Sequence, residues 1–191
     1  MKLNVLISGV GGQGILLCGK ILGSYALKMG LDVKVSEVHG MAQRGGCVVT
    51  HVRMDEKVYS PLIKRGEADA ILAFEPMEAL RYIDYIAKDG AIVTAADKVL
   101  PISVAMGNGE YAKDILDRVN SRCSRVLVVD GAKLAKEAGS LMTLNIVLLG
   151  AFTAMVGLDR SAMEAAIAES VKPQFVEMNR VAFGLGYDLV K

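Results

Sequence analysis

The chain has 191 residues, 52% hydrophobic and 23% charged, the balance of a globular protein that buries a core without disulfides or metals. Its formal net charge is +1 and its basic residues are interspersed with acidic ones, so we expect neither nucleic acid nor a membrane surface as a partner. The three cysteines, Cys18, Cys47 and Cys123, are widely spaced, which excludes a disulfide framework and a self-contained iron–sulfur cluster and is typical of a reducing cytoplasm.

The first part of the chain predicts a strand, a glycine-rich turn, a helix and two further strands. Residues 3–8 are an apolar run, residues 9–14 are rich in glycine, and residues 15–29 have helical periodicity. Strands follow at 32–38 and 47–53. Polar and apolar side chains alternate in the strand at 47–53, so we expect one of its faces to be exposed.

The middle of the chain continues the alternation of strands and helices. Residues 69–74 form a short apolar strand, and Pro76 stands at a favourable first position of the helix that follows it. Three acidic residues flank this strand, Glu67, Asp69 and Glu75, and we expect them to form a solvated rim. The remaining predicted elements here are strands at 91–95 and 125–129, with a helix at 111–120 between them.

The last part of the chain is predicted to be helical. A helix at 133–138 ends at Gly139, and the helix at 143–156 is apolar nearly all round, so it is expected to be buried. Ser161 and the acid three residues later predict a capping box, and Pro173 separates that helix from the last one. The apolar run at 143–156 is shorter than the roughly 20 residues that span a bilayer.

Strands separated by helices predict an α/β protein. The expected fold is a doubly wound, mostly parallel, Rossmann-like sheet with helices on both faces and a helical C-terminal part. We expect one domain over residues 1–191, in a soluble cytoplasmic protein.

The segment Gly9-Val10-Gly11-Gly12-Gln13-Gly14 matches the pattern G-x-G-x-x-G. It follows a predicted strand and opens a predicted helix, the context in which such a turn places backbone amides against a phosphate. Glu37, near the end of the second strand, lies where a ribose-binding carboxylate is expected. The same glycines could instead only pack the strand on its helix, with no ligand.

A second loop concentrates unusual chemistry between the strands at 32–38 and 47–53. Arg44 beside flexible glycine could clamp a phosphate or a carboxylate, and we favour a binding or subunit-contact role over a plain connector. The candidate residues of this loop are Glu37, His39, Gln43, Arg44, Gly45 and Gly46. No cluster of metal-ligand type is evident, so no metal site is predicted.

The sequence gives little support for catalysis by this chain alone. Asn145 lies inside an apolar helix and needs a hydrogen-bond partner if buried, because an unpaired amide costs about 1–3 kcal/mol. No thiamine diphosphate motif, cysteine cluster or Ser/His/Asp arrangement is present, so no catalytic residue is predicted.

Several segments resemble one protein family. Ile7-Ser8-Gly9-Val10-Gly11-Gly12-Gln13-Gly14 is similar to the opening of the gamma-type domain of 2-oxoacid:ferredoxin oxidoreductases. Within that family, the segment from Val35 to Gly46 resembles the indolepyruvate branch, where this piece is the small, or beta, subunit. The resemblance continues in Tyr59-Ser60-Pro61-Leu62-Ile63, in residues 67–76 and in Asn145-Ile146-Val147-Leu148-Leu149-Gly150.

This resemblance implies a large partner subunit that carries thiamine diphosphate and [4Fe–4S] clusters, with no cofactor held firmly by this chain. It implies oxidation of indole-3-pyruvate and related arylpyruvates with coenzyme A to acyl-CoA and CO₂, with ferredoxin reduced, in a heterotetramer. The glycine turn at 9–14 and Arg44 would then face the partner's active site or the phosphates of coenzyme A. A homodimer of the isolated chain is also conceivable.

Three alternatives stay open at this level. The chain could be a self-contained NAD- or FAD-binding Rossmann protein, which would bind a dinucleotide by itself and lose it on Glu37→Ala. It could be the corresponding subunit for another 2-oxoacid. It could also be an assembly module whose glycine turn binds nothing.

Overall fold

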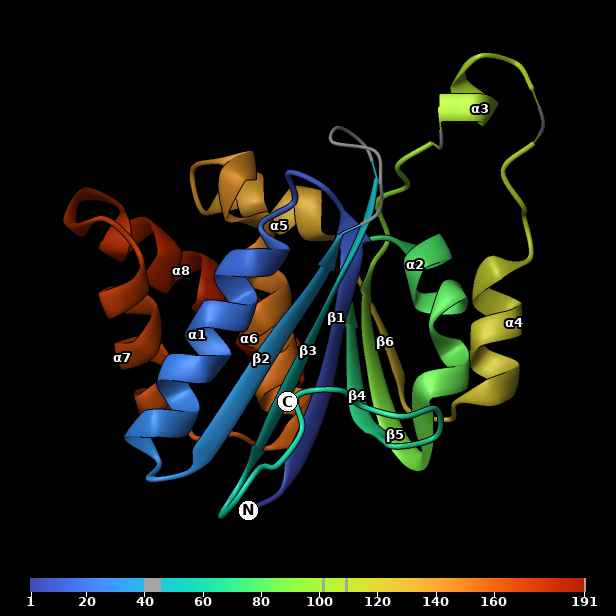
Figure 1. Cartoon of the computed structure of the whole chain (residues 1–191). Helices are drawn as coiled ribbons and strands as arrows, with labels where there is room; N and C mark the ends of the chain where they lie inside the picture. The colour runs from blue at the N-terminus through green and yellow to red at the C-terminus, as the bar shows by residue number, and fades with distance from the viewer. Residues whose placement is uncertain (40–45, 101, 109, 191) are drawn as a thin grey trace.

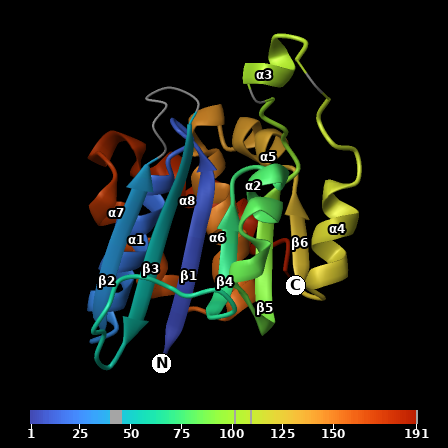
Figure 2. The ribbon, with the colours of Figure 1, turned by 45° about the vertical axis from the view of Figure 1, so that its right-hand side comes forward.

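The structure is a computed structural model that describes residues 1–39, 46–100, 102–108 and 110–190. Its centre is a six-stranded sheet in the order β2-β3-β1-β4-β5-β6 (Figures 1 and 2). The strands are β1 (Leu3–Val10), β2 (Asp32–His39), β3 (Cys47–Asp55), β4 (Ala68–Ala73), β5 (Ile86–Ala95) and β6 (Val126–Val129).

The sheet is mixed but mostly parallel, because β3 alone runs against its neighbours. β1, β4, β5 and β6 pair in parallel, whereas β3 pairs antiparallel with β2 on one side and β1 on the other. β2 therefore runs in the direction of β1 but is separated from it by one strand. The predicted mostly parallel α/β sheet is confirmed, with this departure in strand order.

Helices cover both faces of the sheet (Figure 1). One face carries α1 (Ile15–Lys28), α5 (Gly131–Glu137), α6 (Leu144–Val156), α7 (Arg160–Ser170) and α8 (Val176–Tyr187). The other carries α2 (Pro76–Arg81) and α4 (Ile115–Arg122), while the short α3 (Ile102–Ala105) projects beyond the sheet edge. The two faces bury separate hydrophobic clusters, the larger one under α1 and α6.

The prediction that β3 exposes one face is wrong. Val49 and His51, on the side expected to be exposed, are only 5% and 6% accessible. The segment after β3 folds back over this side, where the Ile63 amide donates a hydrogen bond to His51 Nδ1 at 3.2 Å. A polar side chain in the alternating pattern of β3, such as His51, therefore bonds to a partner inside the fold and does not face water.

Two predicted helix limits also shift. α7 begins after Asp159, whose carboxylate accepts a hydrogen bond from the Ala162 amide at 2.7 Å, so Ser161 is not the N-cap. The helix expected at 111–120 is α4, which starts later, while the Tyr111 hydroxyl donates a hydrogen bond to Glu75 at the start of α2. The helix from Pro76 ends at Arg81.

The prediction for residues 143–156 is confirmed: most of α6 is buried, and its N-terminal part lies against α1. Of the described helices, none combines the length and the apolar character that crossing a bilayer requires.

Candidate functional site

The loops predicted to carry function meet at one edge of the sheet. The parallel strands end there, and β3 starts there, with Cys47 paired to Val10 at the end of β1. This carboxyl edge is the upper edge in Figure 1, and it is where ligands and partners approach open α/β sheets.

The predicted glycine turn connects β1 to α1 and requires glycine for two different reasons. Gly12 and Gly14 have φ values of +96° and +86°, in the left-handed region that favours glycine. Gly9 is required by packing, because a Cβ there would lie 2.6 Å from the Gln13 side chain and 2.9 Å from Phe74 Cβ. The motif therefore has a structural purpose at each of these positions.

Gln13 holds the turn closed from inside. Its Oε1 accepts a hydrogen bond from the Val10 amide at 2.7 Å, and its Nε2 donates to the Phe74 carbonyl at the end of β4 at 3.2 Å. The Gly11 amide donates to the Gly46 carbonyl at 3.0 Å, which joins the turn to the end of the second loop. Three amides of the turn, those of Val10, Gly11 and Gln13, are thus already paired within the chain and are not open to a pyrophosphate.

Asn145, at the start of α6, lies directly against this turn. A Cβ on Gly14 would meet Asn145 Nδ2 at 2.5 Å, so glycine is what allows α6 to approach α1 here. Asn145 is 5% exposed, and its Oδ1 accepts a hydrogen bond from the Ile146 amide at 3.0 Å. Two candidates that are 131 positions apart in the sequence, Gly14 and Asn145, are in contact.

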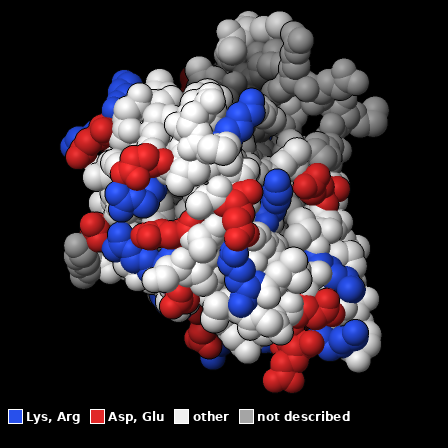
Figure 3. All heavy atoms as spheres, turned by 90° about the vertical axis from the view of Figure 1, so that its left-hand side faces the viewer, with Lys and Arg blue, Asp and Glu red and all other residues white. Residues whose placement is uncertain are grey.

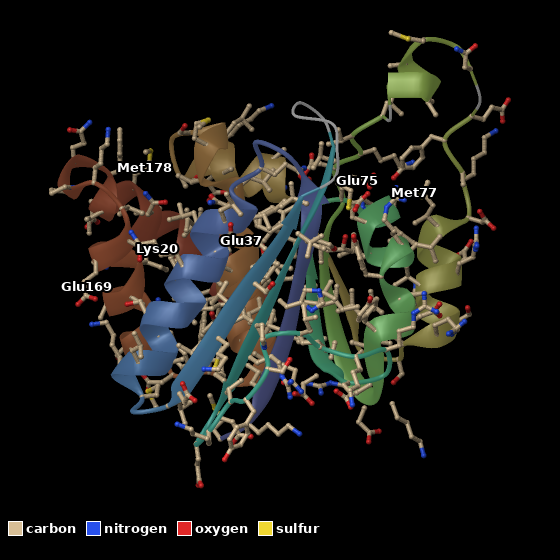
Figure 4. All side chains as sticks on the ribbon, viewed as in Figure 1. Lys20, Glu37, Glu75, Met77, Glu169 and Met178 are labelled. Atoms are coloured by element: carbon tan, nitrogen blue, oxygen red, sulfur yellow. The ribbon has the colours of Figure 1, made fainter. Side chains whose placement is uncertain are left out.

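The second loop is described only at its two ends. Gln43, Arg44 and Gly45 lie outside the described residues, and His39 is placed by its backbone at the end of β2. Glu37 is exposed and pairs with Thr50 of β3, so it lies two strands, about 10 Å, from β1 (Figure 4).

A buried polar cluster at the same edge was not predicted. Glu75 and Glu78, at the start of α2, are only 1% and 4% exposed, so the expectation that Glu75 belongs to a solvated rim is wrong (Figure 4). Glu75 caps α2 by accepting from the Glu78 amide at 3.2 Å, and it also accepts a hydrogen bond from the Tyr111 hydroxyl. The signal that could have shown this is an acid immediately before a proline at a helix start.

Glu78 connects the cluster to the second loop. The Cys47 thiol donates to Glu78 Oε2 at 2.7 Å and lies 3.3 Å from the Tyr82 hydroxyl. Arg81 Nε donates to Glu78 Oε1 at 3.0 Å, and Ser8 Oγ lies 3.4 Å from the Glu78 carbonyl. The first turn of α2 therefore ties together β1 and the start of β3.

Burial governs protonation in this cluster. Desolvation, together with the smaller effect of the hydrogen bond to Glu78, raises the pKa of Cys47 to about 11. Desolvation also raises the pKa of Glu75, against the lowering effect of the Tyr111 hydroxyl. Cys47 is therefore a protonated thiol near neutral pH, which counts against its use as a nucleophile.

The side chains at this edge are better suited to contacting a partner than to catalysing a reaction. Across the described residues, no group of three or more His, Cys, Asp or Glu side chains could hold a metal ion. Cys18, Cys47 and Cys123 are free thiols on α1, at the start of β3 and just after α4. What the edge presents is a rigid glycine turn, a buried carboxylate cluster and the ends of a loop rich in polar side chains.

The whole chain is similar to known proteins of one family. The family model described as "Pyruvate ferredoxin/flavodoxin oxidoreductase" matches residues 4–189. The "Indolepyruvate oxidoreductase subunit IorB" of Pyrococcus horikoshii is 45% identical over 98% of this chain and 96% of its own length.

Two solved structures share the fold. The gamma subunit of a keto/oxoacid ferredoxin oxidoreductase from Geobacter sulfurreducens has a TM-score of 0.74 at 25% identity, and the alignment covers 98% of both chains. The 2-oxoglutarate:ferredoxin oxidoreductase from Magnetococcus marinus has a TM-score of 0.74 at 20% identity, over 99% of this chain but 31% of its own. The fold thus occurs both as a separate chain and as part of a longer one.

Proposed function

The chain belongs to the pyruvate ferredoxin/flavodoxin oxidoreductase family, and we propose that it serves as the small subunit of an indolepyruvate:ferredoxin oxidoreductase. The observation that carries this proposal is the full-length similarity to the Pyrococcus subunit. The lower identity to the 2-oxoglutarate enzyme makes a subunit for another 2-oxoacid the weaker alternative. We treat residues 1–191 as a single gamma-type domain.

The family uses thiamine diphosphate, iron–sulfur clusters and coenzyme A. In the proposed complex, indole-3-pyruvate and related arylpyruvates react with coenzyme A to give acyl-CoA and CO₂, and ferredoxin takes the electrons. An iron–sulfur cluster needs several thiolates close together, and the three separate cysteines of this chain do not fit one. We therefore assign both resident cofactors to a large partner subunit, in a cytoplasmic heterotetramer.

The role proposed for this chain is to present the sheet edge to that partner. Because Gln13 and Gly46 already occupy the amides of Val10 and Gly11, the glycine turn supports a partner-facing role better than phosphate binding. Arg44 remains the candidate for a phosphate of coenzyme A, since a guanidinium binds phosphate through paired hydrogen bonds. Arg44→Ala should then raise the KM for coenzyme A or weaken assembly, and unchanged values for both would refute this role.

The stand-alone dinucleotide alternative has less support. It needs the second strand beside the first, so that a carboxylate such as Glu37 reaches the ribose of a nucleotide on the glycine turn. Here β3 lies between β1 and β2. In addition, the amides of Val10 and Gly11 in the glycine turn are already paired within the chain.

The proposal is tested by anaerobic affinity purification of the tagged chain from its host. We expect a large iron–sulfur protein to copurify and the eluate to reduce a dye in the presence of indole-3-pyruvate and coenzyme A. Purification of the chain alone, with a bound dinucleotide, would overturn the proposal.

A further inference from the structure

An apolar groove lies beside the glycine turn, on the helical face of the sheet. It has a volume of about 340 Å³ and opens where α1, α6 and α8 begin, with Met178 on its wall (Figure 4). Its apolar lining is Leu17, Met142, Val171, Phe175 and Met178. The proposed function leaves this groove without a role.

Apolar side chains continue outward from the groove over the surface. Met142 is 84% exposed and Phe175 is 41% exposed, and Leu16 and Leu141, each next in sequence to a lining residue, are 43% and 53% exposed. Charged side chains of both signs are spread over this side of the molecule, with uncharged surface between them in its upper part (Figure 3). Clustered exposed apolar side chains of this kind mark interaction surfaces.

Two polar groups of the groove, the amide nitrogen of Asn145 and the ammonium group of Lys172, favour a negatively charged occupant. Asn145 is 5% exposed, and its Nδ2 donates no hydrogen bond within the part of the chain that the structure describes, whereas Asn179 Nδ2 already donates to the Phe175 carbonyl at 2.8 Å. Lys172 also lines the groove and has no ion-pair partner among the described residues. No Asp or Glu is among the residues that line it.

Helix dipoles act in the same direction. α1, α6 and α8 have 14, 13 and 12 residues, and the groove is lined by residues of their first turns. The N-terminal end of each helix carries a partial positive charge, so three such ends and one ammonium group converge on an apolar cleft. An occupant that fits must combine an apolar anchor with a carboxylate.

We infer that this groove docks a segment of the large partner subunit, in which an aliphatic or aromatic anchor side chain is followed by an acidic one. This inference rests on the proposed function, because it needs that partner. A protein segment fits better than a small carboxylic acid, because a small molecule in the groove would leave Met142 and Leu141 exposed. Methionine suits such a contact, since its flexible thioether adapts to the shape of a partner.

The test uses the full chain and its large subunit, purified separately and mixed under anaerobic conditions. Met142→Glu and Lys172→Glu should each raise the dissociation constant about tenfold or more, the effect expected when a central anchor or a paired charge is lost. Lys172→Arg should bind as the unaltered chain does. Leu27→Glu is the matched control, because Leu27 is 66% exposed but lies at the other end of α1, and its dissociation constant should change by less than about twofold.

Each other outcome has a definite meaning. If Met142→Glu and Lys172→Glu bind the large subunit as the unaltered chain does, the docking inference is wrong and the proposed function stands. If they bind normally but lose binding of indole-3-acetate, used as a probe, the groove is a small-acid site and the docking inference is equally overturned. If the unaltered chain binds no such subunit, the proposed function fails and the inference fails with it.

Discussion

Because Gly14 is in contact with Asn145, a side chain at position 14 should destabilise the glycine turn. Gly14→Ala adds a Cβ at a residue with φ +86°, and that Cβ would lie 2.5 Å from Asn145 Nδ2. Gly12→Ala is the matched control. Gly12 has a similar φ of +96°, but no atom lies within 4 Å of the added Cβ. Comparing the two substitutions separates backbone strain from steric overlap.

The expected magnitudes follow from these two terms. A side chain in the left-handed region costs about 1–2 kcal/mol, which is the whole effect expected for Gly12→Ala. Overpacking adds about 1–3 kcal/mol, so Gly14→Ala should lower the free energy of unfolding by about 2–5 kcal/mol. Asn145→Ala removes the overlapping amide, so in the double variant with Gly14→Ala about 1–3 kcal/mol should be recovered relative to additivity.

The assay is urea unfolding of the purified chain, followed by circular dichroism, for the two glycine variants, Asn145→Ala and the double variant. Equal losses for Gly14→Ala and Gly12→Ala would show that α6 does not press on the turn. Strict additivity with Asn145→Ala would refute the contact in the same way.

Three further predictions concern the buried cluster. Burial raises the pKa of Glu75 above its ordinary 4.5, so the free energy of unfolding should fall as the pH rises from 4.5 through the raised pKa. Urea unfolding measured against pH should show this fall in the unaltered chain and not in Glu75→Gln. Identical pH profiles for the two proteins would refute this prediction. Tyr111→Phe removes a hydrogen bond to the same carboxylate and should cost about 1–3 kcal/mol in the same assay, whereas a neutral effect would contradict that bond. The pKa of Cys47 is raised from 9.0 to about 11, so at neutral pH it has ~100-fold less thiolate than an ordinary cysteine, and iodoacetamide should modify it slowly. Glu78→Gln should accelerate this reaction, because it removes the carboxylate that accepts the thiol hydrogen bond. Equal rates in the two proteins would argue against the Glu78 contact.

Much of the fold follows from local pattern. The apolar run at 3–8, the glycine turn and the apolar helix at 143–156 were placed correctly because burial and turn conformation are encoded by nearby residues. The mostly parallel sheet also followed, from the alternation of strands and helices.

The failures have a common physical cause, which is contact between distant segments. His51 is buried because residue 63 folds over it, and Glu75 is buried because Tyr111 reaches it from 36 positions away. The antiparallel β3 was not predicted, since period-two alternation carries no strand direction. The neighbours of Asn145 likewise could not be predicted from the sequence, because they depend on the packing of α6 against α1.

The candidate site divides in the same way. The glycine turn was identified from its spacing, but its closure by Gln13 depends on Phe74, far along the chain. Asn145 was singled out as a buried amide, and the structure adds that it contacts Gly14.

We propose that this chain is a required subunit of an oxidoreductase whose cofactors lie on the large subunit. The most direct measurement is ferredoxin reduction by the purified large subunit, with indole-3-pyruvate and coenzyme A, before and after addition of the purified chain. We expect no reduction by the chain alone, little by the large subunit alone, and a rate that rises with added chain and saturates at equimolar subunits. A rate from the large subunit that does not respond to the chain would contradict it.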